Sequence, residues 1–443
     1  MENPALNHRV RTAAAGLALL MATVAFAFHS SIHGQVRALM GMVAFILIAV
    51  VFSANPNRIR WSFIARGVAL QVILAIVILK LSIGDIRPGY IVFAWFAAGV
   101  TRFLEFTSVG AIFVFGEIAD PQAMASVFPN GFVLAFAALP IIIFVSSVFT
   151  VLYHLGVIQL VVRFLAKLMM PVLGTSGAET LSAVANVFMG QTEAPIIVKP
   201  YISRMTQSEL LALMTGGLST IAGSMFAVYV GLGADPVAML TTSVMAAPCG
   251  LYLAKILVPE TESPVTLGDA HVEVNSEHAN VVDAAASGAS NGMQLALNVA
   301  AMLIAFLAFI AMIDYLLALI RSDLSLSVVM AIFFSPVAAL IGVPSPDVPV
   351  IADLLGTKLV TNEMVSYVKL NGEYSGVISD RGHILATYAL TGFANLGSIG
   401  VLLGGIGAMA PGRRADLARL SSKALLGGFI ATLINAAIAA LLL

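Results

Sequence analysis

Two short polar clusters hold the residues of this chain whose types and spacing could do chemistry. The first places Asn186 close to Gln191-Thr-Glu193, and the second is Thr361-Asn-Glu363. An amide both donates and accepts hydrogen bonds, and an ionised carboxylate accepts strong bonds from hydroxyl groups. Oxygen atoms of amides, hydroxyls and carbonyls also suit a hard cation. These residue types therefore predict a binding site for a polar solute or a hard cation.

The rest of the chain is strongly apolar. Of its 443 residues 60% are hydrophobic and 10% are charged, whereas soluble domains carry about 25% charged residues. Long apolar stretches predict an all-α polytopic membrane protein, in which polar groups are costly and usually functional. The balance of 22 basic and 23 acidic residues gives no sign of nucleic-acid binding, and the single cysteine, Cys249, excludes a disulfide framework.

Nine segments are long enough to cross a bilayer, for which about 20 apolar residues are needed. They are 10–29, 37–54, 61–80, 131–154, 207–230, 235–256, 294–319, 382–408 and 424–443. Lys and Arg near the span ends predict a cytoplasmic N-terminus and an external C-terminus. The acidic segment 257–293 is then a cytoplasmic loop. Residues 1–130 are predicted to form a scaffold with an interfacial helix at 88–106.

Two parts of the chain share one order of elements. Each runs as a span, a short amphipathic segment, a region too broken to cross, and two further spans. The first part is 131–256, with its amphipathic segment at 157–172, and the second is 294–443, with its segment at 326–342. An odd number of crossings separates their starts, which predicts that the second part lies upside down. Inverted repeats of this kind are typical of transporters.

The broken regions are predicted to be re-entrant helical hairpins. The first covers 175–205 and turns at Gly190–Glu193, with Pro195 in the first turn of its second half, where proline is tolerated. The second covers 347–372 and turns near Glu363. Irregular backbone at membrane depth needs protein or a wet cavity around it, so a central polar cavity is predicted between the tips.

The spans that follow the hairpins are interrupted as well. Glycine-rich runs occupy Gly216–Gly223 in one span and Gly392–Gly400 in the other. Unwound carbonyl groups there can coordinate a cation or a polar group of a solute. Small residues such as Ser224 are interpreted as positions of close helix packing. Asn395 is interpreted as functional, because a larger polar group in the membrane needs a compensating role.

Several separated motifs occur in one order along the chain. They are Gly190-Gln-Thr-Glu-Ala-Pro195, Lys199-Pro, Met205-Thr-Gln-Ser-Glu-Leu, Thr361-Asn-Glu363, Ala386-Thr-Tyr-Ala-Leu-Thr-Gly-Phe-Ala-Asn-Leu-Gly-Ser-Ile-Gly400 and Ala410-Pro-Gly-Arg-Arg414. In these motifs the chain resembles the bacterial branch of the concentrative nucleoside transporter family, over residues 37–443. The resemblance implies a homotrimer in the bacterial inner membrane that imports nucleosides by sodium symport. It also implies an elevator-like movement of a transport domain against a scaffold, and no enzymatic activity.

The resemblance assigns roles to residues of both clusters. It implies that the substrate, uridine or adenosine for example, contacts eight side chains. These are Gln191, Thr192 and Glu193 at the nucleobase, Glu363, Asn395 and Ser398 at the ribose, and Met225 and Phe393 packed against the ligand. The implied sodium site uses side-chain oxygens of Asn186 and Thr220 and backbone carbonyls of Met189 and Ile221. Met225 leaves the shape of the pocket open, since the family often has a smaller aliphatic residue there.

Other function classes stay open at this stage. Proton-coupled symport would use Glu193 or Glu363 as the carrier, and the sequence allows both carboxylates to be ionised or one to be protonated. An intramembrane carboxylate enzyme would also hold two acids in the membrane, although no nucleophile–base pair or metal-ligand set is recognisable. A channel would share the polar path. Saturable accumulation of substrate against a gradient distinguishes a transporter from both.

Overall fold

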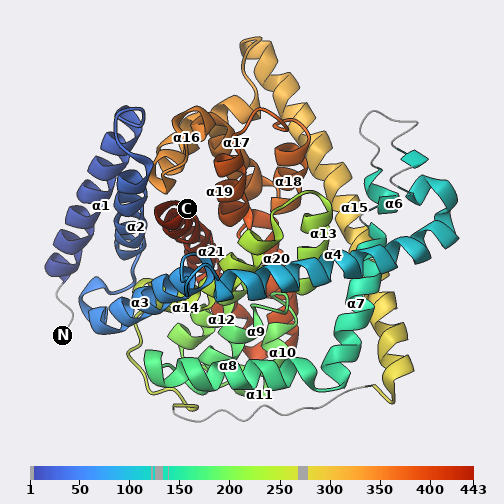
Figure 1. Cartoon of the computed structure of the whole chain (residues 1–443). Helices are drawn as coiled ribbons and strands as arrows, with labels where there is room; N and C mark the ends of the chain where they lie inside the picture. The colour runs from blue at the N-terminus through green and yellow to red at the C-terminus, as the bar shows by residue number, and fades with distance from the viewer. Residues whose placement is uncertain (1–3, 121–122, 125–132, 138, 268–277) are drawn as a thin grey trace.

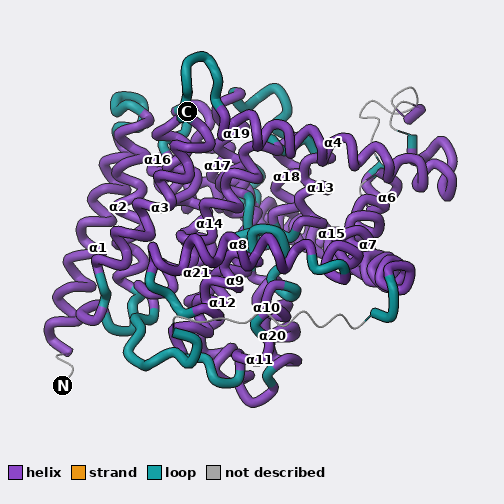
Figure 2. The backbone as a smooth tube through the Cα atoms, turned by 60° about the horizontal axis from the view of Figure 1, so that its bottom comes forward, coloured by secondary structure: helices purple, strands orange, loops and turns teal. Residues whose placement is uncertain are grey.

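The computed structural model describes residues 4–120, 123–124, 133–137, 139–267 and 278–443. Within this part of the chain every regular element is a helix, and isolated β-bridges join only Ile83 with Ile86 and Ser176 with Leu267. Figure 2 shows the helices, joined by loops, in all regions of the molecule. The predicted all-α class is confirmed for the described residues.

The N-terminal part forms four helices and two short 3-10 turns. They are α1 (Pro4–Ala27), α2 (Gly34–Val51), η1 (Pro56–Arg58), α3 (Trp61–Leu79), α4 (Pro88–Phe115) and η2 (Gly116–Ala119). The first three helices lie at the predicted spans. Helix α4 ends at Phe115 rather than at 106 and runs across the direction of α1 and α2 (Figure 1). Its length and composition would also allow a crossing, so its interfacial placement stays a prediction.

The first of the two similar parts contains nine helices among the described residues. They are α6 (Leu134–Ala137), α7 (Leu139–His154), α8 (Val157–Leu173), α9 (Gly177–Ala185), α10 (Ala194–Ile197), α11 (Lys199–Ile202), α12 (Gln207–Ser219), α13 (Gly223–Gly231) and α14 (Pro236–Leu257). Helices α7 and α8 meet at an angle of 70°, next to Gly156, whose φ of 77° favours glycine. Residues 131–132 and 138 of the predicted span 131–154 lie outside the described residues.

The second part repeats this order of helices. It contains α15 (Val281–Ile320), α16 (Leu326–Ile341), η3 (Ser345–Asp347), α17 (Val348–Val360), α18 (Glu363–Asn371), α19 (Asp380–Leu390), α20 (Leu396–Met409), η4 (Pro411–Arg413) and α21 (Arg414–Leu442). In both views the helices α9 and α10 of the first hairpin lie in the lower half of the molecule and α17 and α18 of the second lie in the upper half (Figures 1 and 2).

Two predicted boundaries are wrong. Helix α15 starts at Val281, so the end of the predicted loop 257–293 is helical, whereas Asp269, Glu273 and Glu277 lie outside the described residues. Asn280 caps this helix by accepting a hydrogen bond from the Asp283 amide at 3.0 Å. The predicted span 424–443 likewise starts earlier, at Arg414.

Two glycines in the N-terminal half of α15 lie against α7. A Cβ atom added to Gly288 would lie 2.6 Å from the Thr150 hydroxyl, and one added to Gly292 would lie 2.7 Å from Ile143 Cα. These glycines therefore let α15 pack closely against α7.

Both interrupted spans are broken, but over fewer residues than the glycine-rich runs suggested. Helix α12 continues to Ser219, so Gly216 and Gly217 are helical and the first break is 220–222. The second break, 391–395, lies between α19 and α20. Gly217 serves close packing within the helix, because a Cβ atom there would lie 2.8 Å from Gln191 Cβ.

The number of crossings stays a prediction. Among the described residues eight helices are long and apolar enough to cross a membrane, or nine if the bent pair α7 and α8 counts as one span. This set includes α4, which was predicted to be interfacial. It omits α19 and α20, which are too short to cross individually.

The core of the molecule surrounds α12, α14 and α21, which pack against one another and are almost entirely buried. Apolar residues cover all sides of these helices, as expected for a central position. Helices α4 and α15 are largely exposed, with large apolar side chains such as Trp95, Phe113 and Ile304 on their surfaces. The functional side chains lie between the buried core and the exposed α15.

Candidate functional site

A cavity of about 170 Å³ lies where the two hairpin tips and the two helix breaks meet. Its lining combines residues from both similar parts of the chain with apolar side chains of α15. The structure brings all of the residues predicted to contact a substrate to this cavity: Gln191, Thr192, Glu193, Met225, Glu363, Phe393, Asn395 and Ser398. Residues separated by about 200 positions in the chain therefore form one site.

Glu363 is held firmly at the second tip. It is the first residue of α18 and is 4% exposed. Its Oε1 accepts a hydrogen bond from the Tyr229 hydroxyl at 2.5 Å, and its Oε2 accepts one from Asn395 Nδ2 at 3.0 Å. Because an ionised carboxylate offers about four lone-pair sites, two acceptor positions stay available for a ligand.

Asn395 has two roles in this arrangement. Its Oδ1 accepts a hydrogen bond from the Ser398 amide at 2.8 Å and so caps α20, while its Nδ2 donates to Glu363. The cap fixes the direction of the side-chain amide. The break before α20 thus places Asn395 and Ser398 at the wall of the cavity next to Glu363.

Tyr229 is a site residue that sequence reasoning missed. It lies on α13, is fully buried, and its ring stacks on that of Tyr367 with centroids 4.8 Å apart. A signal was present, because Tyr229 follows Met225 by four residues and therefore shares its helix face. Tyrosine is common in apolar cores, however, and only the packing of α13 against α18 shows that this hydroxyl reaches a carboxylate.

The first tip is a tight turn without helical structure. The Gly190 amide donates to Glu193 Oε2 at 2.5 Å, and a Cβ atom on Gly190 would lie 3.0 Å from the Ala222 Cβ. Only glycine therefore allows this close approach of the tip to the first break. Gln191 is buried and its Oε1 has no hydrogen-bond partner among the residues that the structure describes, while Glu193 is exposed to the cavity.

The two helix breaks contact each other directly. The Phe393 amide donates to the Thr220 carbonyl oxygen at 3.1 Å, which joins the second break to the first. Gly392 has a φ of 143°, and a Cβ atom added to it would lie 3.2 Å from the carbonyl oxygens of Leu218 and Ser219. A side chain at Gly392 would separate the breaks, so glycine is required there.

The residues predicted to hold a cation are also placed beside the first break. Asn186 is fully buried; its Nδ2 donates to the Ser182 carbonyl oxygen at 2.8 Å, and its Oδ1 has no hydrogen-bond partner in the described part of the chain. Thr220 lies in the break, and the Gly223 amide donates to the Phe188 carbonyl oxygen at 3.2 Å, next to Met189. A buried amide oxygen without a partner is costly, and a hard cation would satisfy it.

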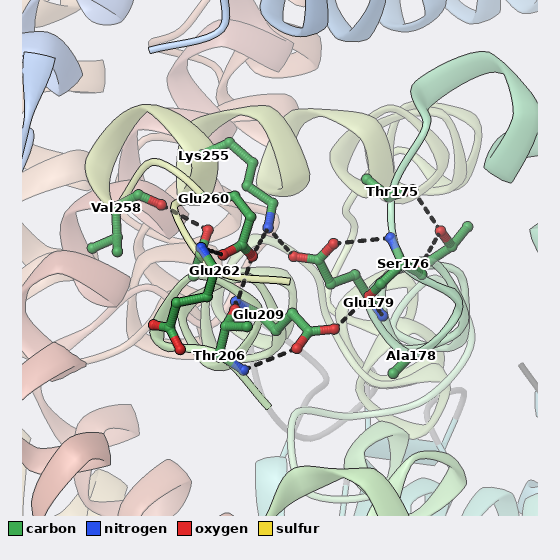
Figure 3. A network of polar contacts seen from close by, with 12 residues as sticks. Thr175, Ser176, Ala178, Glu179, Thr206, Glu209, Lys255, Val258, Glu260 and Glu262 are labelled. Carbon is green, nitrogen blue, oxygen red and sulfur yellow. Dashed lines mark hydrogen bonds and ion pairs between the residues drawn. The ribbon is translucent and has the colours of Figure 1, made fainter. Parts of the chain in front are cut away.

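Two reciprocal helix caps fix the outer end of the first hairpin (Figure 3). The Ser176 hydroxyl accepts a bond from the Glu179 amide, and the Thr206 hydroxyl accepts one from the Glu209 amide, while each glutamate accepts a bond from the amide of the capping residue. The Ser176 hydroxyl also donates to Glu209 Oε1 at 2.6 Å. These capping boxes begin α9 and α12 side by side.

Lys255 joins these caps to α14. Its ammonium forms ion pairs with Glu179 and with Glu260, the latter at 3.1 Å, and Glu260 also accepts a hydrogen bond from the Thr206 hydroxyl at 2.8 Å. All of these side chains are largely buried. The first hairpin, α12 and α14 are therefore tied into one unit, and this fixes the position of Asn186 relative to Thr220.

Three family models match successive parts of the chain. A model described as Na+ dependent nucleoside transporter N-terminus matches residues 40–118, one described as Nucleoside recognition matches residues 135–236, and one described as Na+ dependent nucleoside transporter C-terminus matches residues 238–440. Together they cover most of the chain, including every residue of the cavity.

Similar proteins come from bacteria and animals. An uncharacterised transporter of Haemophilus influenzae is 42% identical over 91% of this chain and 96% of its own length. Sodium/nucleoside cotransporter 1 of Homo sapiens is 37% identical over 92% of this chain, which spans 64% of the human protein.

Solved structures of the transporter CNTnw are similar as well. The inward-facing substrate-bound state is 40% identical, with a TM-score of 0.85 over 92% of this chain and 98% of that chain. A variant of CNTnw in an intermediate state gives a TM-score of 0.87 at 40% identity, over 92% of this chain and 98% of that chain.

Proposed function

Because this chain belongs to the Na+-dependent nucleoside transporter family, we propose that it imports nucleosides as a secondary active transporter, by symport with sodium. Sodium is the coupling ion of this family, and the family consists of transporters rather than enzymes. The observation that carries the proposal is the convergence of both hairpin tips and both helix breaks on one cavity. That cavity combines two carboxylates, three side-chain amides and apolar walls, as a nucleoside requires.

The second tip would hold the sugar. Vicinal ribose hydroxyls donate well to an ionised carboxylate, and Glu363 is already oriented by Tyr229 and Asn395. Charge-assisted hydrogen bonds are about twice as strong as neutral ones, so a pre-oriented Glu363 favours ribose binding. Ser398, on the first turn of α20, lies beside it in the cavity wall.

The first tip would recognise the base. Gln191 offers an amide donor and an acceptor, and its Oε1 has no partner within the described residues. Thr192 and Glu193 add further hydrogen-bonding groups to the same wall, and Met225 and Phe393 supply apolar surface for the ring. A base edge, which has adjacent donors and acceptors, matches this set.

The sodium site would use side-chain oxygens of Asn186 and Thr220 with backbone carbonyls of Met189 and Ile221. When bound, the ion supplies a positive charge that satisfies the Asn186 amide oxygen and the end of α12. These residues then hold the first tip against the first break, which positions Gln191. By reciprocity, substrate raises sodium affinity by the same factor as sodium raises substrate affinity.

An elevator-like movement fits the shape of the cavity. Helix α15 contributes only the apolar side chains Leu295, Val299 and Met302 to the lining, while the polar groups come from the hairpins and breaks. The hydroxyl groups of Tyr229 on α13 and Ser398 on α20 belong to the polar side as well, so a nucleoside bound to this side can slide along the apolar wall of α15. The similar CNTnw chains were solved in outward-facing, intermediate and inward-facing states, which supports movement between two sides of a membrane.

The remaining architecture is part of the same proposal. The hairpins at 175–205 and 347–372 belong to the two halves of an inverted repeat and enter the membrane from opposite sides. The N-terminus is cytoplasmic and the C-terminus lies outside. The chain assembles as a homotrimer in a bacterial inner membrane. The exposed apolar surfaces of α4 and α15 are available to lipid and to neighbouring subunits.

Transport into proteoliposomes tests the function. We expect an inward sodium gradient to accumulate labelled uridine above its external concentration, and a proton gradient alone to leave uptake at the level of diffusion. Labelled adenosine in the same vesicles tests purine import. Uptake that ignores sodium would overturn the symport proposal, and uptake driven by a proton gradient would favour Glu193 or Glu363 as a proton carrier.

A further inference from the structure

A lysine lies fully buried in the first helix of the second hairpin. Lys358 of α17 is 0% exposed, and its Nζ donates to the Ala389 carbonyl oxygen at 2.9 Å and to the Thr432 hydroxyl at 3.1 Å. The ammonium also lies 5.4 Å from the centroid of the Phe429 ring. All three partners are neutral, and no carboxylate of the described residues forms an ion pair with it.

Such a charge is expensive to bury. A methionine would fill similar space without the desolvation cost of an ammonium, and a buried charge in a membrane protein normally marks a functional position. The Glu363 carboxylate attracts the ammonium through space without forming an ion pair with it. The hydroxyl of Thr432 and the ring of Phe429 compensate this cost only in part. The negative group that the ammonium contacts directly is the helix end to which Ala389 belongs.

Ala389 lies in the last turn of α19, directly before the second break. Carbonyl groups in a final turn lack intrahelical partners, and together they give a helix end about −0.5 of an elementary charge. Lys358 places its ammonium on this negative end. The Tyr367 hydroxyl donates to the Thr387 carbonyl oxygen of the same turn at 3.2 Å, so α19 is terminated by side chains of the second hairpin.

The corresponding end of α12 lies beside it. The Leu218 and Ser219 carbonyl oxygens of its last turn are next to Gly392, and the Phe393 amide donates to Thr220 at 3.1 Å. Two negative helix ends therefore approach each other at the crossing of the breaks. Within the described residues no lysine or arginine donates to the last turn of α12, so the two halves differ in how these ends are neutralised.

We propose that Lys358 is a cation held covalently by the chain. Its ammonium neutralises the helix end at the second break, 391–395, as a sodium ion neutralises the helix end at the first break, 220–222. The inference rests on the sodium site proposed at Asn186 and Thr220. One mobile ion and one lysine then neutralise the facing ends of α12 and α19. The chain consequently couples one sodium ion to each nucleoside, and only the first half changes its charge when sodium is released.

Variants of Lys358 test this assignment by sodium activation of uridine uptake in proteoliposomes. The parent should give a Hill coefficient of about one. Lys358→Ser leaves space and a hydroxyl ligand at the second break, and we expect its Hill coefficient to rise toward about two, at a higher half-saturating sodium concentration. Lys358→Met fills the space without a charge and should lower uptake by at least roughly tenfold.

Thr432→Val is the matched control. It removes the other hydrogen-bond partner of the ammonium but keeps its charge and its bond to Ala389, so the Hill coefficient should stay at about one. A Lys358→Ser protein that elutes as a folded oligomer and transports with the parent Hill coefficient would overturn the proposal. Parent-like uptake by folded Lys358→Met would overturn it equally.

A measurement on the unaltered protein keeps the test independent of folding in the variants. The membrane potential at which net uridine flux reverses, measured in proteoliposomes at fixed sodium and uridine gradients, gives the charge moved per nucleoside. One charge is expected, and two would mean that the second half binds an ion of its own, contrary to the inference. Parent uptake that is insensitive to sodium would instead refute the proposed symport, before any variant is considered.

Discussion

At the scale of single residues, the site depends on a carboxylate that is oriented before a ligand arrives. Glu363 is the only group of the cavity with two polar side chains of the protein bound to it in the described structure, Tyr229 at one oxygen and Asn395 at the other. Tyr229 lies on α13, which follows the first break, and Asn395 caps α20, which follows the second break. The orientation of the carboxylate is thus a consequence of where α13 and α20 begin.

Glu363→Ala should weaken uridine binding strongly. Two charge-assisted hydrogen bonds to ribose contribute about 3 kcal/mol together, so the loss corresponds to roughly a 100-fold higher Kd. Binding to detergent-purified protein measures it, with Glu262→Ala in an exposed loop as the control. Unchanged uridine affinity in the Glu363 variant would show that the ribose is bound elsewhere.

Tyr229→Phe removes one hydroxyl and leaves Glu363 Oε1 without this donor. An unsatisfied buried acceptor costs about 1–3 kcal/mol, and we expect uridine affinity to fall roughly tenfold because the carboxylate loses its fixed direction. Tyr374→Phe is the matched control, since Tyr374 donates at 2.9 Å to Asp353, outside the cavity. Equal effects of the two substitutions would contradict a special role of Tyr229.

At the scale of helices, glycine contacts and buried caps set how closely the first hairpin approaches α12. Gly217 allows the Gln191 backbone to lie against the helix, and the caps at Ser176 and Thr206 start α9 and α12 together. The tip therefore has little freedom relative to the break that it faces. Two substitutions probe this arrangement separately.

Gly217→Ala should displace the first tip. The new methyl group would lie 2.8 Å from Gln191 Cβ, so the tip has to move, although alanine favours a helix over glycine by about 0.5–1 kcal/mol. We expect roughly tenfold weaker uridine affinity, by the loss of about 1.4 kcal/mol. Gly404→Ala, where an added Cβ meets nothing within 4 Å, is the control. An effect of Gly404→Ala as large as that of Gly217→Ala would argue against a steric cause.

Lys255→Met should destabilise the whole fold. It leaves Glu179 and Glu260 buried without their counter-charge, which typically costs about 3–5 kcal/mol. Thermal unfolding in detergent should show a clearly lower Tm. Arg321→Met removes an ion pair with Asp323 whose side chains are 65% and 66% exposed, and it should change stability by less than about 1 kcal/mol. Similar Tm values for both variants would mean that the buried ion pairs contribute little.

At the scale of the whole molecule, the distribution of exposed apolar surface indicates which helices face outward. Helices α4 and α15 expose many large apolar side chains, whereas α12, α14 and α21 expose almost none. In the proposed elevator-like movement, the buried polar core would move past these outward-facing helices. The direction of that movement depends on which end of the molecule faces the cytoplasm.

Cysteine labelling checks the proposed orientation. The native Cys249 is buried and should give little background. With the C-terminus outside, Leu443→Cys should react with a membrane-impermeant maleimide on intact cells, and Glu262→Cys should react only after permeabilisation. Both positions are exposed in the structure. The opposite pattern would invert the topology and, with it, the sides from which the hairpins enter.

The sequence by itself determined the features that depend on local chemistry. Apolar length places most helices, and the polar residues of the tips and breaks, such as Gln191 and Glu363, stand out because such groups are costly in a membrane. The motifs around them were enough to indicate the family. All eight residues that the family resemblance assigned to the substrate line one cavity.

Only the tertiary structure decided the features that depend on neighbours distant in the chain. Tyr229 looks like an ordinary residue of an apolar helix until its hydrogen bond to Glu363 is known, and only packing shows that the charged Lys358 contacts the end of α19 at Ala389. Helix α15 starts at Val281, within the segment predicted to be an acidic loop, and its glycines Gly288 and Gly292 lie against α7. Hydropathy records the cost of transferring each side chain, but the partner that offsets this cost is chosen by packing.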